Sequence, residues 1–190
     1  MKKFPILMIL GALLIAGSIG LLLGSRLYGD RAALQSVETA RRIQQLIPAR
    51  TSGIPGERSD TAMPVLALDG RDYVCLLEVP RSSVTLPVAD DWNTRSLADQ
   101  PCRFWGSAMD STLIIGGNSR QFEFCARLDL DDPVVITDMQ GREYTYRVCR
   151  VDRVDSASFE KLNDPNFHLT LFAREGYSGR YVIVRCGLPE

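Results

Sequence analysis

Six side chains of this sequence have the chemistry of a nucleophile or a proton carrier near neutral pH. They are a single histidine, His168, and five cysteines, Cys75, Cys102, Cys125, Cys149 and Cys186. A cysteine attacks a carbonyl as its thiolate, usually with a base close by. No cysteine here has a histidine beside it in the sequence, and three of them stand inside apolar, strand-like runs. We therefore expect most of the cysteines to be buried as small hydrophobic side chains.

The sequence has no pattern typical of a metal or nucleotide site. It contains no Cys-x-x-Cys, no His-x-x-x-His and no glycine-rich phosphate-binding motif. Residues 30–190 carry 19 basic and 23 acidic side chains, whereas a nucleic-acid-binding face is basic. We expect no metal, no cofactor and no nucleic-acid partner. The odd number of cysteines leaves at least one thiol free in a monomer, and their pairing stays open.

The N-terminal segment predicts a single membrane span. From Phe4 to Leu23 there is no charge, and about 20 helical residues cover the ~30 Å of a bilayer core. We expect residues 1–3 to be cytoplasmic, residues 4–24 to be an uncleaved signal anchor, and the rest to lie outside the cell. A cleaved signal peptide ending near Ala16–Ser18 is the alternative. Small residues recur every four positions in the span, which gives a weak case for self-association.

Three further segments follow the predicted span. Residues 25–48 predict a juxtamembrane stalk helix, with Asp30 as its cap, an apolar stripe that includes Val37, Ala40 and Ile43, and Pro48 as its end. Residues 49–62 are rich in Gly, Pro, Ser and charge and predict a linker. A compact domain is expected over residues 63–190.

Short apolar and β-branched runs dominate this last segment. Asp69-Gly70 predicts a hairpin turn between strands at Val65–Leu68 and Tyr73–Leu77. Further strands are expected at Val84–Val88, Leu113–Ile115, Val134–Thr137, Tyr144–Val151, His168–Phe172 and Tyr181–Val184. The pattern predicts a mainly β fold, a closed barrel of about eight strands with a few short helices.

From about Met63 to Cys186 the order of segments resembles the sortases, membrane-anchored cysteine transpeptidases of Gram-positive cell surfaces, and class B-like members in particular. The matching pieces are Leu77-Glu78-Val79-Pro80, Leu86-Pro87-Val88, Pro101–Ser107, Leu113–Asn118, Thr137-Asp138 before Gly141, Leu169–Phe172 and Arg180–Cys186.

The resemblance implies a site of one histidine, one cysteine and one arginine. The cysteine attacks the peptide carbonyl, the histidine moves protons and the arginine stabilises negative charge. In this sequence Asn118 stands at the histidine position, or Gly117 if the register slips by one, and Arg174 stands at the cysteine position. Only Arg180 matches. An amide exchanges no proton near neutrality and a guanidinium is no nucleophile, so transpeptidation is expected to be lost.

Several functional alternatives stay open. The leading interpretation is a catalytically inactive, membrane-anchored sortase-like protein with a binding or accessory role, its partner being a cell-surface protein or peptide or an active sortase. Arg174 and Arg180 would form a positive binding spot with Asn118 beside it, or Arg174 would pair with Glu175 or Glu123 or extend into water. The alternatives are an active sortase that uses another cysteine, Cys125 or Cys186, and a structural or assembly protein that acts through anchor and stalk.

Overall fold

The computed structural model describes residues 14–15, 17–18, 34–54, 62–176 and 178–189. Its labelled elements are listed here in chain order. They are β1 (Thr51–Ser52), β2 (Leu66–Leu68), β3 (Arg71–Val79), η1 (Pro80–Ser82), β4 (Val84–Ala89), α2 (Thr94–Asp99), β5 (Cys102–Trp105), β6 (Leu113–Gly117), η2 (Glu123–Arg127), β7 (Pro133–Asp138), β8 (Arg142–Val154), α3 (Phe159–Leu162), β9 (Leu169–Arg174) and β10 (Tyr181–Gly187).

The predicted span, residues 4–24, lies outside the described residues except for 14, 15, 17 and 18, which are helical. Within the described part of the chain, no helix combines the length and the apolar character needed to cross a bilayer.

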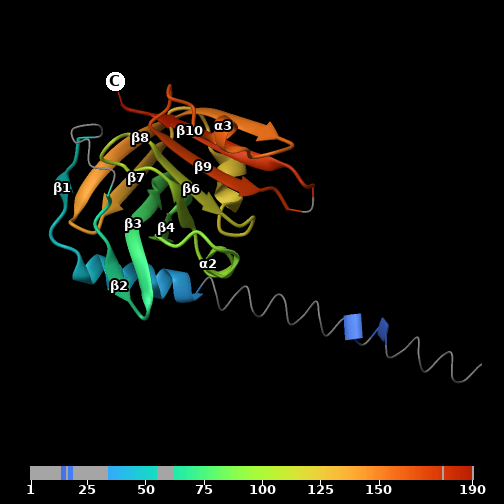
Figure 1. Ribbon diagram of the computed structural model, residues 1–190, viewed down its shortest axis with the longest axis horizontal. Helices are drawn as coiled ribbons and strands as arrows, with labels where there is room; N and C mark the ends of the chain where they lie inside the picture. The colour runs from blue at the N-terminus through green and yellow to red at the C-terminus, as the bar shows by residue number, and fades with distance from the viewer. Residues whose placement is uncertain (1–13, 16, 19–33, 55–61, 177, 190) are drawn as a thin grey trace, which may run out of the picture. The chain divides into compact units, whose positions relative to one another are not determined.

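Eight strands close into a barrel (Figure 1). Neighbouring strands follow the order β8-β10-β9-β6-β5-β4-β3, and β7 pairs with both β3 and β8, which joins the two ends. The short strands β1 and β2 extend the sheet next to β8 and β3. The predicted mainly β, closed eight-stranded barrel with short helices is therefore confirmed.

Alternating side chains of the strands fill the barrel. Val74, Leu113, Leu171 and Val184 are fully buried members of one large core cluster. The predicted hairpin turn between β2 and β3 is present: Asp69 and Gly70 both have positive φ, 52° and 77°, as a tight two-residue hairpin turn requires.

The helix at residues 34–46 packs onto the barrel. Ala40 and Ile43 are 3% and 0% exposed and lie in a cluster with Tyr73 and Leu76 of β3, whereas Val37, expected on the apolar stripe, is 63% exposed. Ala40 and Ile43 are three positions apart in the helix and therefore share a face, and this face is the buried one. The compact unit runs from Ser36 to Glu190, so it begins earlier than the expected boundary at residue 63.

Residues after this helix also belong to the compact unit. Thr51 and Ser52 form β1 on the edge of β8, within the segment expected to be a linker. Beside them, the Arg50 guanidinium pairs with the carboxylates of Glu78 and Glu143, each at 2.5 Å. These ion pairs raise the pKa of Arg50.

Candidate functional site

Strands β6 and β9 end, and strand β10 begins, at the same rim of the barrel. β6 and β9 are parallel, with Gly117 opposite Ala173, and β9 and β10 are antiparallel, with Arg174 opposite Tyr181. The three positions singled out in the sequence therefore lie at this rim. Asn118 follows β6, Arg174 ends β9, and Arg180 precedes β10.

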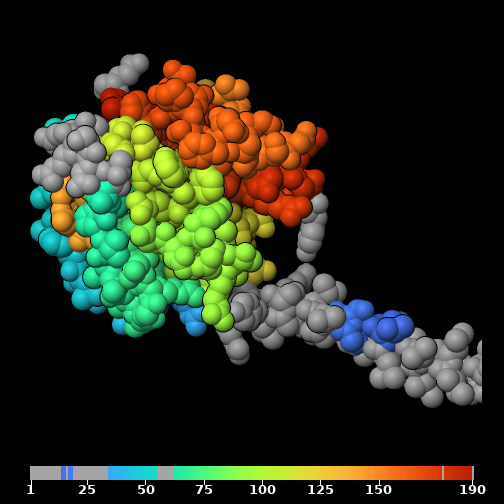
Figure 2. Space-filling model, viewed as in Figure 1, coloured from blue at the N-terminus to red at the C-terminus, as the bar shows by residue number. Residues whose placement is uncertain are grey.

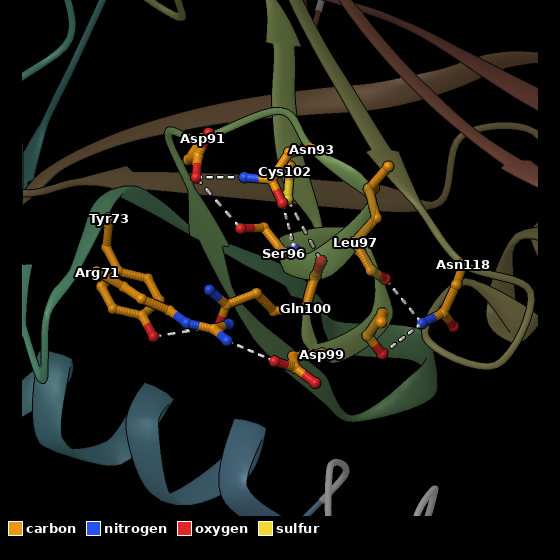
Figure 3. A network of polar contacts seen from close by, with 11 residues as sticks. Arg71, Tyr73, Asp91, Asn93, Ser96, Leu97, Asp99, Gln100, Cys102 and Asn118 are labelled. Atoms are coloured by element: carbon orange, nitrogen blue, oxygen red, sulfur yellow. Dashed lines mark hydrogen bonds and ion pairs between the residues drawn. The ribbon is translucent and has the colours of Figure 1, made fainter. Parts of the chain in front are cut away.

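The Asn118 side chain links the end of α2 to the loop between β6 and η2, and Figure 3 shows its two bonds to α2. Its Nδ2 donates to the carbonyl oxygens of Leu97 and Ala98 at 3.0 and 3.1 Å. Its Oδ1 accepts hydrogen bonds from the backbone N–H groups of Arg120 and Gln121, both at 3.0 Å. The last carbonyls of a helix lack partners within the helix, so Asn118 satisfies two of them at the end of α2. The amide thus acts as a clamp between α2 and the β6–η2 loop.

The other side of α2 is fixed to β3, as Figure 3 also shows. Arg71 pairs with Asp99 at 2.5 Å, and the Tyr73 hydroxyl donates to Gln100 Oε1 at 3.1 Å. The ion pair raises the pKa of Arg71, and burial raises the pKa of Tyr73. At its start, α2 is capped by Asn93, whose side chain accepts from the Ser96 N–H at 2.9 Å. The position of Asn118 therefore depends on a network that reaches back to β3.

Arg174 ends β9 and is exposed. A Cβ added to Gly179 would lie 3.9 Å from Arg174 Nη2, so the guanidinium extends beside the turn between β9 and β10. Among the described residues Arg174 has no ion pair. Glu175 pairs with Arg153 and Glu123 pairs with Arg127, both at 3.1 Å, so neither acid pairs with Arg174.

The guanidinium of Arg180 pairs with Asp155. Its Nε lies 3.5 Å from Asp155 Oδ1, and both side chains are largely exposed, at 61% and 93%. Exposed pairs of this kind add at most ~1 kcal/mol to stability. The rim thus holds one amide engaged in a clamp and two guanidinium groups, of which one is paired.

Among the residues that the structure describes, no thiol or imidazole lies at this rim. Four cysteines, Cys75, Cys102, Cys125 and Cys186, are 0% exposed. Burial raises the pKa of the Cys102 thiol to about 12 and raises the pKa values of the thiols of Cys75, Cys125 and Cys186 as well. Such thiols stay protonated near neutral pH, and thiolate is the reactive form.

The exposed cysteine and the histidine lie at the other end of these strands. Cys149 Sγ is 2.9 Å from the position of a Cβ on Gly187, the last residue of β10, whereas Arg180 precedes the first. Seven strand residues separate the two ends by about 20 Å. His168 precedes β9, and its backbone N–H donates to the Cys186 carbonyl at 2.9 Å, at the end of β9 opposite Arg174.

Aromatic rings cover the face next to the rim. Phe172 and Arg174 are two residues apart on β9 and so share a face. The Phe172 ring lies 5.7 Å from the ring of Trp92, which lies 4.8 Å from that of Phe104. Phe159 of α3 continues the cluster, 6.3 Å from Phe104. Figure 2 shows the lime segment around β5 and the orange segment around α3 next to each other on this surface.

A pocket of about 360 Å³ opens on the other side of Arg174. We call it the arginine pocket and define it by six of its lining residues: Arg120, Phe122, Ala126, Ala173, Arg174 and Val182. Arg120 and Phe122 were not predicted, because only the pairing of β6 with β9 brings the β6–η2 loop beside Arg174. Within the described residues, neither Asn118 nor Arg180 lines the arginine pocket.

Comparison with known proteins identifies the architecture. The family model "Sortase domain" matches residues 77–185. The structure is similar to sortase A from Corynebacterium diphtheriae (TM-score 0.55, 22% identity, covering 63% of this chain and 62% of that one). It is also similar to sortase C1 from Streptococcus agalactiae (TM-score 0.56, 21% identity, 65% of this chain and 72% of that one). A lid mutant of the Corynebacterium enzyme aligns over 85% of this chain and 94% of its own, with TM-score 0.55 and 18% identity.

The alignment with the first of these structures spans less than two thirds of that protein's length. No curated protein matches this chain. At identities of 18–22% the structural likeness establishes the fold, and the family model covers more than half of the sequence. The class B-like assignment stays a prediction. On the match of residues 77–185 and the closed barrel that they form, the chain belongs to the sortase family.

Proposed function

We propose that this chain is a sortase-fold protein without transpeptidase activity, tethered to a membrane by residues 4–24, with a binding or accessory role at the cell surface. The observation that carries the proposal is the composition of the rim. Asn118, Arg174 and Arg180 stand at this rim, and the thiols and the imidazole of the described residues lie in the core or at the other end of β9 and β10.

The chemistry at each position supports the loss of catalysis. Both polar groups of the Asn118 side chain are occupied by backbone partners, and an amide neither gives nor takes a proton near neutral pH. Arg174 carries a guanidinium, which is not a nucleophile near neutral pH and forms no thioester.

The face beside Arg174 carries aromatic rings. An extended peptide that approaches Arg174 from the Phe172 side meets the rings of Trp92, Phe104 and Phe172. Trp92 lies against the backbone of Gly116, where a Cβ would be 2.5 Å from the ring. A peptide bound there would pack against these rings.

The test is an assay for both steps of transpeptidation. The full chain, purified in detergent, is incubated with sorting-signal peptides and an amine, and the products are analysed by mass spectrometry with an active sortase as positive control. We expect intact peptide and no covalent adduct. Cleavage or an adduct would refute the proposal, and its loss in Cys125→Ser, Cys149→Ser or Cys186→Ser would identify the thiol used. Self-association that survives deletion of the barrel would favour an assembly role through the N-terminal segment instead.

A further inference from the structure

The helix at residues 34–46 is held on the barrel by a small contact. Its fully buried apolar side chains are Ala40 and Ile43. They pack on Tyr73 and Leu76 of β3, in a cluster that is separate from the large core of the barrel. An element with few buried apolar contacts opens at a lower free energy than the strands of a core. This helix is therefore able to leave the barrel while the barrel stays folded.

The same contact buries polar atoms without a partner. Among the described residues, Ser36 Oγ, Gln100 Nε2 and Thr137 Oγ1 make no hydrogen bond, although these residues are only 6%, 5% and 0% exposed. Ser36 lies four positions before Ala40 and so shares the buried face of the helix. Thr137 stands opposite Leu76 in the pairing of β3 with β7, so it shares the face of the sheet that the helix covers. A buried polar atom without a hydrogen bond disfavours the packed state, so these atoms ease release of the helix.

A chain of contacts leads from this helix to α2 (Figure 3). The Tyr73 ring packs in the cluster under the helix, and its hydroxyl donates to Gln100 Oε1 at 3.1 Å. Burial raises the pKa of Tyr73, whereas its hydrogen bonds to Gln100 and to Thr39, a residue of the helix, act against this rise. Gln100 ends α2, where its backbone N–H donates to the Ser96 carbonyl at 2.9 Å. The end of α2 is thus held by a side chain that lies under the helix.

Asn118 carries the connection from α2 to the rim. Its Nδ2 donates to two carbonyl oxygens near the end of α2, and its Oδ1 accepts from the N–H groups of Arg120 and Gln121. Arg120 in turn lines the arginine pocket beside Arg174. The β6–η2 loop is therefore tied to α2, and α2 is tied to the contact under the helix.

We propose that the helix at residues 34–46 is a conformational switch for the rim. With the helix docked, Tyr73 and Gln100 hold the end of α2, and Asn118 holds the β6–η2 loop. With the helix released, α2 and this loop loosen together. The inference goes beyond the binding role proposed above and does not depend on the loss of catalysis. The helix follows the segment predicted to span a membrane, so a force or a partner that acts on that segment meets the helix before the barrel along the chain.

The test is amide hydrogen exchange of the full chain in detergent, read by mass spectrometry. In Ile43→Ala, which removes most of the largest side chain of the helix contact, the amides of residues 94–100 and 118–127 should exchange at least ~10-fold faster, while β9 and β10 keep their rates. Ile43→Val takes its place if Ile43→Ala does not fold. Val37→Ala, on the exposed side of the same helix, should leave every segment unchanged. Val184→Ala, equally buried but in the large core, should not accelerate residues 94–100 and 118–127 selectively.

Tyr73→Phe interrupts the chain of contacts and keeps the ring under the helix. It should accelerate exchange in residues 94–100 and 118–127 and leave that of residues 34–46 unchanged. In the double variant with Ile43→Ala the two effects on α2 and the loop should not add, because both act through the contact with Gln100. Thr137→Val, which removes an unpartnered hydroxyl at nearly constant shape, should slow the exchange of residues 34–46.

The inference is overturned by unchanged exchange of residues 94–100 and 118–127 in both Ile43→Ala and Tyr73→Phe. It is also overturned by equal acceleration of all segments in Ile43→Ala, or by additive effects in the double variant.

Discussion

The ring of Trp92 lies directly against the backbone of Gly116. A Cβ at Gly116 would be 2.5 Å from Trp92 Cη2 and 2.8 Å from Phe172 Cζ. Glycine is therefore required at this point of β6 by the close approach of two rings.

Gly116→Ala should displace Trp92. We expect a loss of about 1–3 kcal/mol in the free energy of unfolding, measured by urea denaturation, because an added methyl group overfills a packed site. The tryptophan fluorescence should shift as Trp92 becomes more exposed. In a Trp92→Ala background the same substitution should cost clearly less, and a cost that is independent of Trp92 would contradict this packing.

Asn118→Ala should loosen α2. It removes both hydrogen bonds to the carbonyls of Leu97 and Ala98, and we expect a loss of about 1–2 kcal/mol in unfolding free energy. Asn118→His should not restore the stability, since one ring nitrogen cannot donate to two carbonyls while the other accepts from two N–H groups. Asn166→Ala is the control. Its side chain donates only to the nearby Asp164, in an exposed loop, and its effect should stay within about 0.5 kcal/mol.

Ile43→Ala tests whether the helix at residues 34–46 is part of the folded unit. Ile43 is fully buried against the barrel, so its truncation should cost about 2–5 kcal/mol. Val37→Ala, on the exposed side of the same helix, should change stability by no more than about 0.5 kcal/mol. Equal, small effects of the two substitutions would mean that the helix is detached in solution.

Thiol labelling should separate one cysteine from the other four. In the native protein, iodoacetamide at pH 7.5 should modify Cys149, the exposed thiol, and leave the four buried thiols unmodified. Peptide mapping by mass spectrometry reads out each site. In an Arg174→Cys variant the new thiol should also react, because Arg174 is exposed. Rapid native labelling of Cys125 or Cys186 would instead indicate an open thiol and revive the active-enzyme alternative.

The buried thiols predict a loss of stability in alkali. The pKa of Cys102 is raised from 9.0 to about 12, so the folded state holds its proton more tightly than the unfolded state. This contribution is complete below pH 9 and is lost as the pH rises from 9 towards 12. The urea midpoint should therefore fall over this range, and it should fall less steeply in Cys102→Ala.

Local patterns were sufficient to predict most of the barrel. Alternating β-branched runs located β3, β4 and β6–β10, and Asp69-Gly70 located a hairpin turn. Strand β5 was not predicted, because Cys102–Trp105 is short and only its Cys102 pairs with β4. β1 was missed since a two-residue strand has no periodicity.

The site was predictable only in part. The ends of β6, β9 and β10 follow from the resemblance, and the register places Asn118, Arg174 and Arg180 at one rim. Which residues each charged side chain lies beside does not follow from sequence spacing. Arg180 pairs with Asp155, and Arg120 shares a pocket with Arg174, because loops distant in sequence meet at the rim.

The position of β10 has a consequence for synthesis of the protein. This strand follows β8 and β9 in the sequence and so leaves the ribosome after them, yet it lies between the two and bonds to both. A nascent chain that stops before Tyr181 exposes two unpaired strand edges, which invite pairing with other chains. The growing chain is therefore prone to aggregation until β10 has emerged, and a stop just before Tyr181 would leave the edges of β8 and β9 unpaired.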